Sequence, residues 1–370
     1  MRTLISDAIH YLEREQDQET PKDAGQVIAC DTSDTMLPGP GYEPVQKPGI
    51  LVAGCGGTGN SVINRLFHRG FFGPRTLVID HDRQTFRHSH AAVPFLLQHS
   101  YFRREHLGVP EGHPDSVAAA AENARPDLEK PVGYPDLCII VAGMGGNAGT
   151  GSAPAVARIA KSRGALVIAL LTLPSRLEKT RYGRAQKGLD DLLNIADSVF
   201  VLDLNYLLKM MPGDLSLKCM YSVADQVLSE TVRNLYERIC TPSLVNLDFS
   251  DVVHLLAGGG YGTLLIGETR EQNFVEGVCR DTKKNRMGDI PLSAITGCII
   301  LIEGHYAGLF SSDEIATGIC YDLDPRAGII WGAQEIPSIP EGETRVFALV
   351  SAGGKNTGPS FKKNTRNLIV

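Results

Sequence analysis

The sequence is poor in features that would place the protein in a membrane, a disulfide framework or a nucleic-acid complex. No apolar run approaches the roughly 18 residues that a spanning helix requires. The eight cysteines are scattered from Cys30 to Cys320 without a Cys-x-x-Cys pair, which favours reduced thiols in the cytoplasm. A net charge of −6 lacks the basic excess typical of nucleic-acid-binding proteins. We therefore expect a cytoplasmic globular protein with no membrane span and no nucleic-acid partner.

Several catalytic signatures are also missing. No Gly-x-Ser-x-Gly elbow of a serine hydrolase and no Gly-Lys-Ser/Thr ending of a Walker loop occurs. Histidines are concentrated at His81, His88, His90 and His99, but neither cysteines nor an HExxH motif accompany them. The sequence therefore predicts no protein-held metal site, no acyl transfer and no lysine-based phosphate loop.

Glycine is abundant at one place. Five of the nine residues from Gly143 to Gly151 are glycine, and they follow the apolar run Leu137–Ala142. Successive backbone N–H groups can converge on an anion where such a loop enters a helix, here expected over Pro154–Ser162. The alternative is a tight strand-to-helix turn. We interpret the stretch as a phosphate cradle, because turns seldom need so many glycines.

An earlier unit carries a second glycine-rich loop. The predicted strand Ile50–Ala53 leads into Gly54–Asn60, a helix over Ser61–His68, and a strand over Thr76–Ile79 that ends in Asp80. This pattern satisfies the dinucleotide fingerprint Gly-x-Gly-x-x-Gly with an acid about twenty residues later. A Rossmann-type, NAD-dependent oxidoreductase is therefore one hypothesis.

The order of predicted elements indicates the fold class. Strand candidates at Leu137–Val141, Ala165–Leu173 and Ser198–Leu202 alternate with segments of helical length. Such alternation is typical of an α/β protein with a parallel sheet covered on both faces. The glycine-rich loops should then lie together at the carboxyl edge of the sheet.

A specific resemblance narrows the hypotheses. The pattern Gly-Met-Gly-Gly-x-x-Gly-Thr-Gly-x-Ala-Pro of Gly143–Pro154 resembles the signature loop of the FtsZ and CetZ branch of the tubulin superfamily. Gly108–Asp115 resembles that family's phosphate loop, and Asn246–Val252 resembles its synergy loop. Gly260-Tyr261 and Gly328–Ala333 fit its C-terminal domain. The resemblance covers about residues 49 to 354.

The resemblance implies a tubulin/FtsZ-like organisation: a Rossmann-type parallel-sheet GTPase domain, a central helix and a smaller mixed-sheet domain. The corresponding ranges are 1–48 for an N-terminal helix and linker, 49–216 for nucleotide binding, 217–239 for the central helix, 240–354 for the C-terminal activation domain and 355–370 for a basic tail. The first range contains apolar residues at helical spacing from Leu4 to Leu12, followed by prolines.

The resemblance also implies a pocket for GTP or GDP with Mg²⁺, which would offset phosphate charge. Tyr221 and Asp225 lie four residues apart and share a helix face, so the ring can stack on guanine while the carboxylate accepts its N1 and N2 hydrogens. A core tyrosine and a solvated acid are the alternative. The expected nucleotide-binding residues are Gly56, Gly57, Thr58, Asn60, Asp82, Gly108, Gly112, Gly145, Gly146, Asn147, Ala148, Gly149, Thr150, Gly151, Glu178, Arg181, Asn205, Tyr221 and Asp225.

The synergy loop is expected to serve a neighbouring subunit. It follows a central helix of roughly 34 Å, so its acids lie far from their own chain's nucleotide. By resemblance, Asp248 and Asp251 polarise the water that attacks the γ-phosphate of the next subunit, and Asn246 is a polar contact there. A head-to-tail contact of this kind generates an open homopolymer. The alternative is an ordinary acidic helix N-terminus.

Departures from the family pattern leave a further alternative open. Relatives usually carry Gly-Thr where this chain has Asn147-Ala148, so one hydroxyl donor to phosphate is missing, worth about 1 to 3 kcal/mol. Leu204 also stands where a guanine-contacting Asn is common, with Asn205 beside it. A filament or scaffold protein that hydrolyses GTP slowly or not at all is therefore the alternative to a GTPase acting in cell division or cell shape. The basic tail could bind a membrane adaptor or another FtsZ-like protein.

Overall fold

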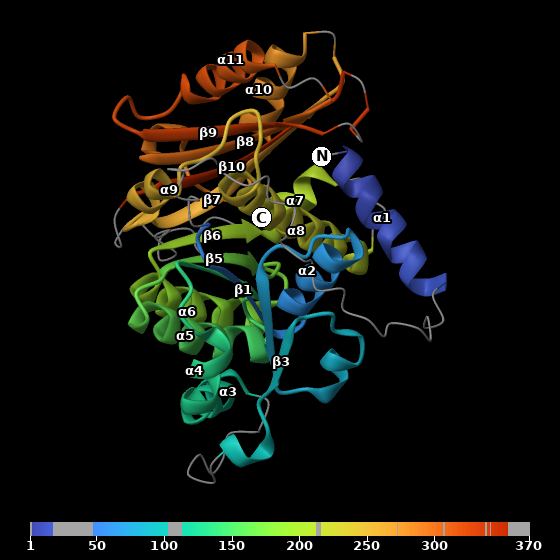
Figure 1. Cartoon of the computed structure of the whole chain (residues 1–370). Helices are drawn as coiled ribbons and strands as arrows, with labels where there is room; N and C mark the ends of the chain where they lie inside the picture. The colour runs from blue at the N-terminus through green and yellow to red at the C-terminus, as the bar shows by residue number, and fades with distance from the viewer. Residues whose placement is uncertain are drawn as a thin grey trace, which may run out of the picture.

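A mixed sheet of ten strands runs through the whole molecule in the computed structural model, which describes residues 2–17, 47–102, 113–211, 216–271, 273–305, 308–336, 339–340 and 342–353. The strand order is β3-β2-β1-β4-β5-β6-β7-β10-β8-β9 (Figure 1). The strands are β1 Ile50–Cys55, β2 Arg75–Asp80, β3 Val93–Leu96, β4 Leu137–Gly143, β5 Leu166–Leu173, β6 Ser198–Asp203, β7 Gly260–Thr269, β8 Gly297–Gly304, β9 Gly328–Glu335 and β10 Thr344–Ala352.

Helices cover both faces of this sheet. They are α1 Arg2–Asp17, α2 Gly56–His68, α3 Pro114–Asn123, α4 Arg125–Val132, α5 Asn147–Ser162, α6 Lys179–Ile195, α7 Leu204–Met210, α8 Leu217–Cys240, α9 Phe249–Leu256, α10 Phe274–Lys284 and α11 Leu309–Cys320. Short 3₁₀ helices span Arg83–His88, His99–Tyr101 and Leu292–Ala294. None of the helices in the described ranges is both long and apolar enough to cross a membrane.

The predicted parallel α/β sheet is confirmed for the first half of the chain. Strands β3, β2, β1, β4, β5, β6 and β7 are all paired in parallel, and the inner residues of β1, β4, β5 and β6 are apolar and buried on both faces. Along β4, Ile140 belongs to the core on the α3–α6 side, while Ile139 and Val141 belong to the core under α2 and α8. Burial on both faces explains why these strands are continuous apolar runs without alternation.

The C-terminal half continues the same sheet. Four residues of β6 pair in parallel with β7, and the antiparallel strand β10 then pairs with both β7 and β8. Helices α10 and α11 cover the same face as α3–α6, whereas α8 and α9 cover the opposite face. The mixed sheet expected for this half is present, but it is joined edge to edge with the parallel sheet. The domain boundaries given above remain predictions.

Helix α8 also joins the two halves through buried charges. Arg233 on α8 lies 2.9 Å from Glu230 and 2.7 Å from Glu303 of β8, and both carboxylates are almost fully buried. Arg238, with no exposed side-chain surface, donates to the carbonyl of Ile302 at 3.2 Å. The central helix is therefore tied to the C-terminal strands by buried ion pairs and a hydrogen bond as well as apolar packing.

Two predicted helix starts were wrong. The helix after the second glycine-rich loop begins at Asn147, seven residues before the predicted Pro154, and the helix after the first begins at Gly56, five residues before Ser61. Packing overrides the low helix propensity of glycine here. A Cβ at Gly151 would lie 2.7 Å from the Pro114 carbonyl oxygen, so only glycine lets α5 approach α3 this closely.

Two further predictions concern parts of the chain at its edges. Arg2–Asp17 forms the helix expected near the N-terminus, and Figure 1 shows it beside α7 and α8. The linker from residue 18 to 46 and the basic tail from 355 onward lie outside the described residues. Cys30 lies there as well, and the other seven cysteines are free thiols in the described structure.

Candidate functional site: a cleft at the carboxyl edge of the parallel sheet

A cleft of about 470 Å³ opens where the strands β1, β2 and β4 end. Strands β1 and β4 are neighbours in parallel register, with Cys55 opposite Ala142, so the two glycine-rich segments that follow them meet at one edge. This confirms the expected position of the loops. The residues that line the cleft are Cys55, Gly56, Gly57, Thr58, Ser61, Asp80, His81, Asp82, Thr85, Gly143, Gly146, Asn147, Ala148, Gly149, Arg181, Tyr221 and Asp225.

Two helix N-termini face this cleft. Helix α2 begins at Gly56 and α5 begins at Asn147, and both first turns contribute lining residues. The first N–H groups of a helix have no partner within the helix, and the helix dipole adds partial positive charge there. Neither N-cap supplies a side-chain hydrogen bond, since the caps are Cys55 and Gly146. The edge therefore offers backbone donors suited to an anion.

Gly56 shows why the loops are rich in glycine. Its φ of +74° lies in the left-handed region, and a Cβ at this position would stand 2.8 Å from the backbone nitrogen of Gly149. Any side chain would push the α2 and α5 N-termini apart. Gly57 differs, because a Cβ there would meet nothing within 4 Å.

The far end of the cleft carries an aromatic ring with polar partners. The Tyr221 hydroxyl donates to Glu178 Oε1 at 2.9 Å, and Arg181 Nη1 donates to Glu178 Oε2 at 2.6 Å and to the Tyr221 hydroxyl at 3.2 Å. Burial alone would raise the pKa of Glu178, but these two hydrogen bonds outweigh it and lower that pKa. Asp225 lies one turn after Tyr221 on α8 and also lines the cleft. Glu178, which does not line the cleft itself, thus positions the side chains of Arg181 and Tyr221, which do.

Asp80, His81 and Asp82 line the side of the cleft at the end of β2. Asp80 accepts from the backbone nitrogens of His81 at 2.7 Å and Asp82 at 3.1 Å, and the His81 ring nitrogen Nδ1 lies 3.1 Å from Asp80 Oδ1. Burial of Asp80 favours its neutral form, yet hydrogen bonds from His81, Asp82 and Thr85 lower its pKa. The Asp80 carboxylate in turn raises the pKa of His81, against the effect of burial.

Eleven of the expected nucleotide-binding residues line the cleft, and others lie beside it. Thr150 is buried and its hydroxyl accepts from the Gly145 backbone at 2.8 Å, so it shapes the loop from within. Asn60 donates to the Thr85 carbonyl at 2.9 Å, and Gly151 faces α3. Gly108 and Gly112 lie outside the described residues. The residues on the cleft are Gly56, Gly57, Thr58, Asp82, Gly146, Asn147, Ala148, Gly149, Arg181, Tyr221 and Asp225.

Asn205 does not lie on the cleft surface. Its side-chain oxygen accepts from the Arg176 backbone at 3.0 Å, and its nitrogen donates to Asp203 at 2.6 Å. The residue therefore braces the segment before α6 against the start of α7. The sequence suggested a base contact only because Asn205 follows the position where relatives carry an asparagine.

Six cleft residues were absent from the expected set: Cys55, Ser61, Asp80, His81, Thr85 and Gly143. Asp80 was visible as the acid at the end of β2, and Gly143 as the start of the second glycine-rich loop. His81 and Thr85 carry no local pattern. The chain turns after β2 and brings His81 and Thr85 to the cleft. The spacing of residues in the sequence does not predict this turn.

The acids of the synergy-like segment lie at the other end of α8. This helix has 24 residues, a length of about 36 Å, with Tyr221 and Asp225 in its first turns and Asn246 to Asp251 after its end. Asp248 caps α9 by accepting from the Ser250 nitrogen and hydroxyl, both at 2.8 Å, which lowers its pKa. Asp251 is exposed in the first turn of the same helix. The structure does not bring these acids to the cleft of their own chain.

Within the described residues, neither the cleft nor the segment from Asn246 to Asp251 holds a cluster of protein ligands for a metal. The described residues contain no group of three or more His, Cys, Asp or Glu side chains placed to bind one ion. The cleft does present hard oxygen donors, from Thr58, Asn147 and Asp82, of the kind that Mg²⁺ accepts alongside phosphate oxygens. Such a donor set fits an ion that enters with a phosphate ligand.

Comparison with known proteins agrees with this geometry. Residues 49–212 match the family described as "Tubulin/FtsZ family, GTPase domain". The chain is 35% identical over 319 residues to cell division protein FtsZ 2 of Halobacterium salinarum, covering 85% of this chain and 80% of that protein.

Two solved structures extend the comparison. The FtsZ dimer of M. jannaschii superposes with a TM-score of 0.76 at 32% identity, covering 83% of this chain and 88% of that one. A GTPγS-bound CetZ2 protofilament subunit from Haloferax volcanii, at 17% identity, shares the fold with a TM-score of 0.65, covering 83% and 94% of the two chains. The identity to FtsZ proteins over most of both chains shows that this protein belongs to the tubulin/FtsZ family.

Proposed function

We propose that the protein is a GTPase that assembles head to tail into protofilaments and hydrolyses GTP between subunits. The single observation that carries the proposal is the separation of the two halves of the site along α8. The cleft has helix N-termini suited to an anion and lies at the start of α8, a helix about 36 Å long, whereas Asp248 and Asp251 follow the opposite end of that helix. An active site divided in this way is complete only when a second subunit places its α9 over the cleft.

In this proposal each part of the cleft has one role. The N-termini of α2 and α5 bind the phosphates, with Mg²⁺ supplying charge neutralisation beside Thr58 and Asp82. Tyr221 stacks on the base, Asp225 accepts its N1 and N2 hydrogens, and Glu178 orients Arg181 toward the ribose. The partner's copies of Asp248 and Asp251 orient and polarise the attacking water. The relatives described as an FtsZ dimer and a CetZ protofilament support assembly of this kind.

GTP turnover measured against protein concentration tests the divided site. Turnover per subunit should rise steeply as subunits associate, and Asp251→Ala should remove most of it while GTP binding to the monomer stays unchanged. Asp313→Ala, which removes an exposed acid on α11, is the matched control and should leave turnover near the wild-type level. Turnover that is independent of concentration, or that survives Asp251→Ala, would contradict catalysis between subunits.

A second candidate function is that of a filament or scaffold protein that hydrolyses GTP slowly. It is favoured by Ala148, which lines the cleft without a hydroxyl donor where relatives usually carry threonine. Pelleting assays separate the two candidates. Polymers that sediment with GTP but show negligible turnover at every concentration would support the scaffold.

A further inference from the structure

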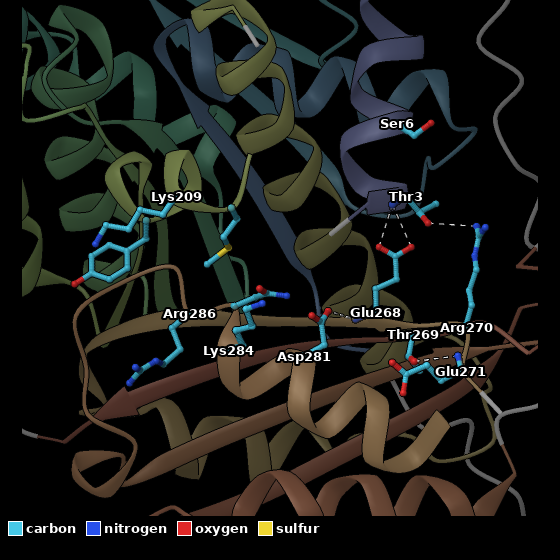
Figure 2. A pocket seen from close by; sticks show the side chains of 13 residues that line it. Thr3, Ser6, Lys209, Glu268, Thr269, Arg270, Glu271, Asp281, Lys284 and Arg286 are labelled. Atoms are coloured by element: carbon cyan, nitrogen blue, oxygen red, sulfur yellow. Dashed lines mark hydrogen bonds between the residues drawn. The ribbon is translucent and has the colours of Figure 1, made fainter. Parts of the chain in front are cut away.

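A second, larger cleft lies at the carboxyl end of β7. Its volume is about 1090 Å³, and it is lined by residues of α1, α7, the end of β7 and the end of α10 (Figure 2). Because β7 runs parallel to β6, this end of β7 lies at the same edge of the sheet as the nucleotide cleft. The two clefts share no lining residue. Crevices outside the carboxyl ends of parallel strands are the usual ligand sites of open α/β sheets.

The carboxylates of this second cleft already have partners. Glu268 accepts from the backbone nitrogen of Thr3 at 3.1 Å, and Asp281 accepts from the backbone nitrogen of Glu268 at 2.9 Å. Glu271 binds Arg280 at 2.7 Å. Figure 2 shows Thr3 and Glu268 meeting on the α1 side of the cleft. Each of these carboxylates therefore accepts from a donor of the protein itself, and Glu271 is also ion-paired.

The opposite side of the cleft has cations without such partners. Lys209 of α7, Lys284 at the end of α10 and Arg286 just after it form no ion pair with any carboxylate of the described residues. The Lys209 ammonium lies 4.7 Å from the centre of the Tyr206 ring, and the Arg286 guanidinium makes only a long contact of 3.5 Å to the Ile290 carbonyl. Three positively charged residues from two parts of the chain therefore line one cavity.

The chemistry of these three groups points to one class of ligand. Lysine ammonium groups bind phosphate as point charges, and arginine can bind two of its oxygens at once. A singly charged anion would leave part of this positive charge unneutralised, even with the Asp281 carboxylate in the same cleft. We propose that this cleft binds a small ligand with two or more phosphate groups, held between Lys209 on α7 and Lys284 and Arg286 beside α10.

Such a ligand would join the two halves of the molecule. Helix α7 follows β6 of the nucleotide-binding half, whereas α10 belongs to the C-terminal half. A polyphosphate bridging them replaces repulsion between like charges with attraction, so its occupancy favours the arrangement of the halves seen here. The site is separate from the GTP cleft, and its ligand is an effector rather than a substrate.

Inorganic pyrophosphate titrated into the full-length chain in saturating GDP tests the proposal, with binding measured by calorimetry at about 150 mM salt. We expect saturable binding of one pyrophosphate per chain. Lys209→Gln and Lys284→Gln should each weaken it about tenfold, the effect of losing one charged hydrogen bond. Lys284→Arg should retain it. Lys161→Gln, which removes a lysine paired with Asp197 at 2.9 Å on another part of the surface, is the matched control and should not weaken binding.

Two measurements keep the result interpretable. GDP affinity at the nucleotide cleft and thermal unfolding should be unchanged in the glutamine variants, which separates this site from the proposed GTPase site and from misfolding. If the ligand is itself a nucleotide, the nucleotide-free chain binds two GDP molecules and the lysine variants bind one. A single GDP per chain together with no saturable pyrophosphate binding would overturn the proposal, as would binding of poly-glutamate but not pyrophosphate.

Discussion

At the scale of single residues, Ala148 is where we expect this cleft to differ from the usual pattern of the family. It lies in the first turn of α5, where its methyl group faces the nucleotide cleft and its carbonyl accepts from Ser152 at 2.7 Å. The position is almost fully buried, so a side chain placed there contacts whatever the cleft holds. In the proposed site, the missing hydroxyl removes one donor from the end of the cleft that binds phosphate.

Restoring this donor should raise GTP turnover. Ala148→Thr adds a hydrogen bond to a charged acceptor, worth about 1 to 3 kcal/mol, which corresponds to an increase of roughly 5- to 150-fold in kcat/KM if it forms in the transition state. Ala148→Val has the same branched shape without the hydroxyl and is the control. An equal increase in both variants would show that side-chain volume, and not the hydroxyl, sets the rate.

His81 makes a pH-dependent contribution to the free energy of unfolding. Its pKa is raised by Asp80, so the charged ring is stabilised in the folded protein. This stabilisation is fully present below the ordinary histidine pKa of about 6.5 and is lost as pH rises through the raised value. The free energy of unfolding of wild type minus that of His81→Gln should therefore be largest below about pH 6.5 and fall as the pH rises above it.

Urea titrations of the nucleotide-free protein at several pH values measure this difference. His254→Gln, which changes an exposed histidine on α9, serves as the control. A difference between wild type and His81→Gln that stays constant across the range would show that the Asp80–His81 contact is not charged in the folded state.

At the scale of elements, helix α1 is part of the core and not a free extension. Leu4 and Ala8 have at most 1% of their surface exposed, and the Ala8 carbonyl accepts from Ser222 of α8 at 3.0 Å. The Arg65 guanidinium of α2 lies 3.9 Å from the centre of the Tyr11 ring. An isolated helix of 16 residues is marginal in water, so these contacts with α2 and α8 stabilise it.

Shortening the buried side chain of α1 should therefore destabilise the protein. We expect Leu4→Ala to lower the free energy of unfolding by about 2 to 5 kcal/mol, because it leaves a cavity between α1 and its neighbours. His10→Ala, at an exposed position of the same helix, should change it by less than about 0.5 kcal/mol. Chemical denaturation measures the free energy of unfolding of both variants. Equal effects of Leu4→Ala and His10→Ala would mean that α1 does not pack on the rest of the chain in solution.

At the scale of the whole molecule, one continuous sheet and one long helix hold the two halves of the proposed active site apart. The cleft lies at the start of α8 and the acids of α9 follow its end. A subunit that lacks one half can therefore still supply the other half to a neighbour in the polymer.

Mixing two inactive variants should restore turnover. Gly57→Phe adds a bulky ring at a residue that lines the nucleotide cleft, and we expect it to hinder nucleotide binding while the backbone keeps its place, because a Cβ there meets nothing within 4 Å. Asp251→Ala keeps the cleft and removes an acid. In an equal mixture about one interface in four combines an intact cleft with an intact acid, so turnover should reach up to roughly a quarter of the wild-type rate.

Each variant assayed alone is the control for the mixture and should show little turnover. Circular dichroism and sedimentation of the mixture establish that both variants fold and co-assemble. If co-assembled polymers hydrolyse no more GTP than the two variants alone, the acids and the cleft do not act across an interface.

Much of the nucleotide cleft could be predicted because its signals are local. Glycine-rich segments directly after apolar runs indicate strand ends with backbone donors, and the parallel register of β1 and β4 brings these ends together. Thr150 and Asn205 show the limit of this reasoning. Both lie in the predicted segments, but their side chains bind the protein's own backbone or Asp203.

The sequence by itself determined the α/β class, the family and the edge of the sheet where a phosphate ligand would bind, since apolar runs, glycine positions and motif spacing are properties of short segments. Only the tertiary structure decided that α5 begins at Asn147, that α1 packs on α8, that His81 reaches the cleft and that three cations without an ion pair among the described residues line a second cavity. These features depend on contacts between residues far apart in the chain. Their geometry is set by how the sheet and its helices pack, which no local pattern records.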